Sequence, residues 1–112
     1  MKLYTIIVGI GKDRDEQRIL KGERLDIRFR IEKKLLERHG GYTILESSGG
    51  WMDGSNVVKE PGLTILVVDG EDDSKITKTA LDVCSFARQS TVCVIYAGGH
   101  TVFLPWVRGD KA

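Results

Sequence analysis

An indole stands among small polar residues in the stretch ESSGGWMDG, residues 46–54. Trp51 follows Gly49 and Gly50, which predict a bulge or an unusual turn. In that setting the ring either covers the core beside a distorted strand or stacks on a ligand. Neighbouring side chains offer hydrogen-bond donors and acceptors; they are Ser47, Ser48, Ser55, Asn56, Lys59 and Glu60. An aromatic plane with hydroxyls and cations suits a nucleotide-like molecule.

Basic residues of segment 22–38 could extend this site. Arg28 is our candidate for a contact across the sheet edge, and it stands among other cations: Arg24, Arg30, Lys33 and Lys34. Asp26, Glu32 and Glu37 are interleaved at spacings suited to pairs within a helix, so a solvated helix face is the competing interpretation. His100, beside a pair of glycines, completes the predicted ligand-binding set.

Three other features could indicate a phosphate loop, catalytic histidines or a cation site, and each has a simpler explanation. The run Gly9-Ile10-Gly11-Lys12 lacks the spacing of a phosphate loop. His39 and His100 have no obvious nucleophile or carboxylate partner, and a histidine at a helix C-terminus, as we expect for His39, interacts favourably with the helix dipole. Asp69, Glu71, Asp72 and Asp73 could bind a hard cation, but acids also favour a helix N-terminus. We predict no metal site, cofactor or catalytic residue.

Composition narrows the classes of protein further. With 112 residues and 41% hydrophobic content, residues 1–112 suit a single domain. A net charge of +1 provides no field toward nucleic acid or an anionic membrane. The strands lack the aromatic pattern of RNA-binding sheets, which argues against RNA binding. No secretory signal is visible. No uncharged run reaches the ~18 residues that span a bilayer, so we expect no membrane helix. Cys84 and Cys93 fit neither a disulfide framework nor a zinc site, so we expect buried thiols in a reducing cytoplasm.

Periodicity predicts the elements. Apolar strands are expected at 3–11, 42–52, 62–70 and 91–97, with a turn before Pro61 and Gly62. Residues 22–41 alternate like a strand but also form a helical face, and their length, composition and closing glycines favour a helix. Asp73 or Ser74 could cap a second helix whose apolar stripe is Ile76, Ala80, Val83, Cys84 and Ala87. Gly98 and Gly99 predict either a hairpin to a further strand or a bulge.

This order predicts an α+β fold, a two-layer ferredoxin-like βαββαβ sandwich with or without an extra C-terminal strand. Both helices would cover one face of an antiparallel sheet. The strands show little polar alternation, so the second face should also be covered. Contact with a second copy of the chain is the simplest cover, and we expect a homo-oligomer.

The run GGYTILESSGGWMDGSNVVKEPGLTILVVDG, residues 40–70, resembles a family of small bacterial and phage proteins known as a domain of unknown function. In that family a strand ends in Gly-x-Trp, a short turn follows, and a Glu precedes an apolar strand; the matching positions are Gly49, Trp51 and Glu60. The resemblance covers residues 41–104, and the tryptophan of the family's first helix has no counterpart. It implies the α+β fold and no particular activity.

Together these features predict a non-catalytic protein that captures an anionic, nucleotide-like ligand at a subunit boundary. Small phage proteins that sequester nucleotide immune signals offer an analogy. Two alternatives stay open. One is a small enzyme acting on a nucleotide or phosphorylated metabolite, with Glu60 or His100 as acid or base, and the other is a protein-interaction module that inhibits a partner.

Overall fold

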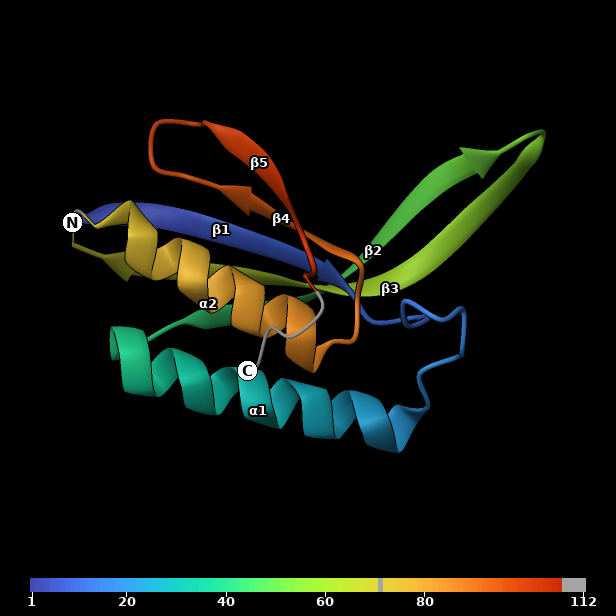
Figure 1. Ribbon diagram of the computed structural model, residues 1–112, viewed down its shortest axis with the longest axis horizontal. Coiled ribbons are helices and arrows are strands. Elements are labelled where there is room, and N and C mark those ends of the chain that lie inside the picture. Colours follow the sequence, from blue (N-terminus) through green and yellow to red (C-terminus); the bar gives the residue numbers. More distant parts are fainter. Residues whose placement is uncertain (71, 108–112) are drawn as a thin grey trace.

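The computed structural model describes residues 1–70 and 72–107. Its elements are β1 (Lys2–Gly9), α1 (Lys21–His39), β2 (Thr43–Asp53), β3 (Asn56–Asp69), α2 (Asp73–Phe86), β4 (Thr91–Ile95) and β5 (Thr101–Pro105). The strands form one antiparallel sheet in the order β2-β3-β1-β4-β5, and both helices lie on the same face of it (Figure 1). The predicted ferredoxin-like α+β sandwich is confirmed, with β5 as the extra strand.

The ambiguous segment is a helix because its apolar residues reach the sheet at helical spacing. Ile27, Ile31 and Leu35, four residues apart, are buried in the core. Gly40 ends α1 in the left-handed conformation at φ 78°, where its N–H donates to the Leu36 carbonyl at 3.2 Å. The alternating residues Leu25 and Phe29 are exposed, so they mark no strand face.

The core lies between the helices and the inner face of the sheet. Tyr4, Ile6 and Val8 point inward from β1, and the whole predicted stripe of α2 is buried. The cap of α2, predicted at Asp73 or Ser74, lies one or two residues earlier. Asp72 is the N-cap, and its carboxylate accepts from the Ser74 N–H at 3.0 Å.

The β2–β3 hairpin is longer and more regular than the sequence predicts. Its ladder runs without interruption from Thr43 opposite Leu66 to Asp53 opposite Asn56, and Gly54, at φ 63°, lies in the turn. The predicted bulge is therefore wrong, because Gly49 and Gly50 keep the register opposite Glu60 and Lys59. The strand predicted to begin at Gly62 begins at Asn56. Figure 1 shows the two arms extending away from the helices.

The outer face of the sheet, opposite the helices, is apolar, and none of the helices and strands that the structure describes covers it. Residues directly opposite in an antiparallel ladder share a face, and the ladders place on this face the exposed apolar side chains Leu3, Ile7, Leu45, Val68 and Phe103. Phe103 is 69% exposed. We call this set the outer apolar face.

The two glycines near the C-terminus form the predicted hairpin between β4 and β5. Gly98 and Gly99 have φ values of 94° and 95°, and the Tyr96 N–H donates to the His100 carbonyl at 2.8 Å. Within the described ranges, neither helix is long and apolar enough to cross a membrane.

Candidate functional site

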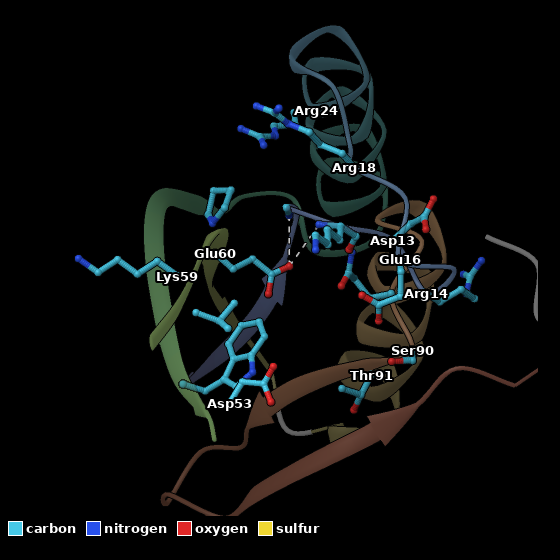
Figure 2. Close-up of a pocket in the computed structure, with 16 residues that line it drawn as sticks. Asp13, Arg14, Glu16, Arg18, Arg24, Asp53, Lys59, Glu60, Ser90 and Thr91 are labelled. Atoms are coloured by element: carbon cyan, nitrogen blue, oxygen red, sulfur yellow. Dashed lines mark hydrogen bonds between the residues drawn. The ribbon is translucent and has the colours of Figure 1, made fainter. Parts of the chain in front are cut away.

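A pocket of about 650 Å³ opens where the β2–β3 hairpin leaves the body of the sheet (Figure 2). Its walls come from β2 and β3, from the loop between β1 and α1, from the first turn of α1, and from the segment before β4 with the first residue of β4. The residues that line it are Gly11, Lys12, Asp13, Arg14, Glu16, Arg18, Arg24, Trp51, Asp53, Val58, Lys59, Glu60, Pro61, Gln89, Ser90 and Thr91. This volume suits a small organic ligand.

Glu60 lies at the centre of this pocket in Figure 2. Its Oε1 accepts from the Gly11 N–H at 3.3 Å and from the Lys12 N–H at a longer 3.5 Å. A Cβ on Gly9 would lie 2.8 Å from that oxygen, and one on Gly11 would lie 2.7 Å from the Glu60 Cγ. The two glycines of the run 9–12 therefore make room for a carboxylate rather than for a phosphate loop.

Trp51 does not cover the core. Its side chain is 51% exposed, and the tryptophan that packs against the core is Trp106. Trp51 lies opposite Val58, and Gly49 lies opposite Glu60, so these four residues share one face of the hairpin. Gly49 has no side chain and nothing lies within 4 Å of an added Cβ, which leaves space beside Glu60. The interpretation of Trp51 as a cover for the core is wrong.

Five basic side chains line the pocket, namely Lys12, Arg14, Arg18, Arg24 and Lys59, and none forms an ion pair with a described residue. Arg14 stacks on the Trp106 ring, with its guanidinium carbon 3.9 Å from the ring centroid. Lys59 points away from Glu60 in Figure 2. Lys12, Arg18 and Arg24 therefore remain as cations for a ligand.

The predicted site residues fall into three groups. Trp51, Lys59 and Glu60 line the pocket. Gly49, Gly50 and Ser48 form the rungs of β2 opposite Glu60, Lys59 and Pro61.

The other two predicted residues lie outside the pocket. Arg28 lines a neighbouring groove and pairs with Glu32 at 2.9 Å and Glu46 at 3.4 Å. His100 lies in the β4–β5 turn, past the end of β4, whereas Thr91 at the start of β4 reaches the pocket.

The sequence prediction missed Gly11 and Arg18, and it named Arg24 only as one of the cations around Arg28. A signal for the two arginines existed, because basic residues near a helix N-terminus oppose the helix dipole and so require another reason to be there. Gly11 could be recognised only once the chain brought it to Glu60, a residue 49 positions away.

The predicted acidic cluster serves the fold. Asp69 binds the ring of His39 and the Nζ of Lys75, the latter at 3.2 Å, and Asp72 caps α2. Glu71 lies outside the described residues. Among residues 1–70 and 72–107, no three His, Cys, Asp or Glu side chains gather in a way that could hold a metal ion.

His39 does have a carboxylate partner, contrary to the sequence prediction. Its side chain is fully buried; Nδ1 meets Asp69 and Nε2 lies 2.8 Å from the Thr79 hydroxyl. The bond to His39 and the Gly70 N–H lower the pKa of Asp69 to about 2. Thr79 is itself buried and also accepts from Arg38 at 3.1 Å. The chain of contacts from Asp69 through His39 to Thr79 has the order of a catalytic triad. The Thr79 hydroxyl is buried, however, so no substrate can reach it as it would reach a nucleophile.

The two thiols differ in burial. Cys84 is buried in the core as predicted, whereas Cys93 is only partly buried, on the outer face of the sheet. Burial raises the pKa of the Cys93 thiol, which disfavours the reactive thiolate.

No protein-family model and no curated protein matches the chain. Solved structures share its fold. A phage SAM lyase in complex with S-methyl-5'-thioadenosine matches with a TM-score of 0.62 and 14% identity over 97% of this chain and 92% of the lyase chain. A phage SAM lyase in its apo state matches with a TM-score of 0.61 and 16% identity, over 97% of this chain and 91% of the lyase chain. The periplasmic divalent cation tolerance protein CutA from Archaeoglobus fulgidus matches with a TM-score of 0.52 and 16% identity, over 97% of this chain and 88% of the CutA chain. At such identities the likeness shows the α+β fold alone.

Proposed function

We propose that this chain is a non-catalytic protein that binds an anionic molecule containing adenosine in the Glu60 pocket. The observation that carries the proposal is the combination of a half-exposed indole, a central carboxylate and cations without an ion pair among the described residues, around a volume of about 650 Å³. The nucleoside bound to the phage SAM lyase of the same fold supports adenosine as the base and sugar.

Each part of such a ligand has a counterpart in the pocket. The indole of Trp51 offers a face on which a base stacks. The Glu60 carboxylate, held by the Gly11 N–H, can accept from ribose hydroxyls, as acidic residues do in dinucleotide sites. Lys12, Arg18 and Arg24 attract the negative charge.

The same proposal includes a homo-oligomer with the ligand at a subunit boundary. The ladder places Gly9 and Glu60 on the same side of the sheet as Ile7 and Leu45, so the pocket borders the outer apolar face. An apolar face of this extent is costly to leave in water, and a second copy would cover it. Capture of a nucleotide immune signal, as in small phage proteins, would need only such binding.

An enzyme acting on the same ligand is the second candidate. The observation that favours it is Glu60, whose carboxylate faces the pocket and could act as a base toward a bound molecule. A lyase among the proteins of this fold supports it.

Fluorescence titration tests the proposal. In a Trp106→Phe background, adenosine, S-methyl-5'-thioadenosine, SAM, AMP and cyclic nucleotides are added while the emission of Trp51 is recorded. We expect saturable quenching by an anionic member of the panel, and calorimetric binding of the same ligand should be lost in Trp51→Ala without loss of the fold. Absence of any binder would refute the proposal.

Mass spectrometry of the recovered ligand separates the two candidates. A ligand returned unchanged after denaturation of the complex supports capture. Its conversion, lost in Glu60→Gln, supports the enzyme.

A further inference from the structure

A second, smaller cavity adjoins the pocket on the α1 side. It has a volume of about 370 Å³, and the two share Arg24 and Pro61 as lining residues. Its other walls come from the residue after β1, from the first half of α1, from β2 and from β3. The residues that line these walls are Ile10, Lys21, Leu25, Arg28, Glu46, Ser47, Gly62 and Leu63. We call it the α1 groove.

The shared residue Arg24 is incompletely satisfied. Its Nε is buried and has no hydrogen-bond partner, and its guanidinium forms no ion pair with any residue that the structure describes. A buried donor without a partner is costly and rare. An acceptor from outside the chain would remove that cost.

Arg18 strengthens the case for an external acceptor. It lines the same pocket, forms no ion pair with a described residue, and extends in Figure 2 toward the same rim as Arg24. Lys21 adds a third cation on the groove side, where the N-terminus of α1 carries partial positive charge as well. Like charges gathered at one place repel unless an anion lies between them.

Arg28 shows the contrast within the same groove. Glu32 and Glu46 already neutralise it, so it needs no anion. Where the two cavities meet, Arg18, Lys21 and Arg24 have no ion-pair partner among the residues that the structure describes, and their three charges exceed what one carboxylate would balance.

We infer that the ligand carries a chain of phosphates that passes over Arg24 from the Glu60 pocket into the α1 groove. The inference rests on the proposed function and narrows its ligand class to a nucleoside di- or triphosphate. The base and ribose occupy the larger cavity, and the phosphates lie between Arg18, Lys21 and Arg24.

Calorimetric titration with adenosine, AMP, ADP, ATP and S-adenosylhomocysteine tests it. We expect affinity to rise with each of the first two phosphates and to fall with added salt, while the affinity of adenosine is insensitive to salt. Arg24→Gln should weaken ADP binding at least about tenfold, because charged hydrogen bonds are lost, and leave adenosine binding unchanged.

Arg30→Gln is the matched control, since it removes the same charge from the same helix at a residue paired with Asp26 at 3.0 Å outside both cavities. It should bind ADP like the parent. If Arg24→Gln fails to fold, Arg18→Gln makes the same test from the loop. Equal affinities for AMP and ADP, both above that of adenosine, would overturn the phosphate chain while the proposed function stands. A gain with S-adenosylhomocysteine equal to that with AMP, and none from ADP, would likewise overturn it in favour of one carboxylate. No binding by any of the five would defeat both.

Discussion

His39 ties the end of α1 to β3 and α2, and its removal should be one of the most destabilising single changes in the chain. The ring is fully buried and both nitrogens are bonded, one to Asp69 and one to Thr79. Each partner keeps other contacts: Asp69 retains Lys75 at 3.2 Å and the Gly70 N–H at 2.6 Å, and Thr79 retains Arg38 at 3.1 Å.

The expected magnitude follows from these contacts. Loss of a charge-assisted bond costs about 1.5–3 kcal/mol, and the space left by a buried ring adds to that cost. Because Asp69 stays paired, we place the total for His39→Ala at about 3–4 kcal/mol, below the upper end for breaking a buried ion pair. A domain of this kind has a free energy of unfolding of about 5–15 kcal/mol, so the variant should unfold at much lower denaturant.

Urea denaturation at pH 7, followed by far-ultraviolet circular dichroism, measures this free energy. His100→Ala is the control, since His100 is exposed and an exposed substitution should stay within about 0.5 kcal/mol of the parent. If the two alanine variants lose the same small amount, His39 does not hold the elements together and the reasoning fails.

Three further outcomes are expected. Because the pKa of Asp69 is lowered from 3.8 to about 2 in the folded chain, its contribution to stability is complete above pH 3.8 and is lost as the pH falls toward 2. In Asp69→Asn the free energy of unfolding should therefore depend less on pH within that window. An unchanged pH profile would count against the His39 contact. Gly11→Ala should displace Glu60 and weaken ligand binding about tenfold, since an added Cβ meets its side chain at 2.7 Å, whereas Gly41→Ala, which meets nothing within 4 Å, should bind normally. Phe103→Glu should shift sedimentation from the oligomer to the 12.5 kDa monomer, and a parent that already sediments as a monomer would refute the oligomer.

Much of the fold was predictable because its signals are local. The stripe of α2, the glycine at the end of α1 and the Gly98-Gly99 hairpin each depend on residues a few positions apart. The length of the β2–β3 hairpin was predicted wrongly because glycine and proline residues such as Gly49, Gly50 and Pro61 usually interrupt strands. In the structure these residues pair within the β2–β3 ladder, and the Pro61 carbonyl also accepts from the Ile10 N–H at 2.9 Å.

The candidate site was predictable only in part. Trp51, Lys59 and Glu60 lie near one another in the chain, and their chemistry could be recognised together. Gly11 and Arg18 come from a loop whose position depends on the pairing of β1 with β3, and Asp69 meets His39 across 30 residues. Contacts of that range follow from the packed fold, and no short motif carries them.

The central place of β1 has a consequence for synthesis of the chain. It pairs with both β3 and β4, and its first partner, from Gly62 to Asp69, is made far later than β1 itself. At 5–20 residues per second, roughly 60 further residues take about 3–12 seconds to emerge.

During that delay the uncharged run LYTIIVGI, residues 3–10, has both edges open, which is the condition under which short apolar strands pair with copies of themselves. The strand that later organises the sheet is thus an apolar segment that stays without its partners for several seconds in the nascent chain, and slower synthesis would lengthen that exposure.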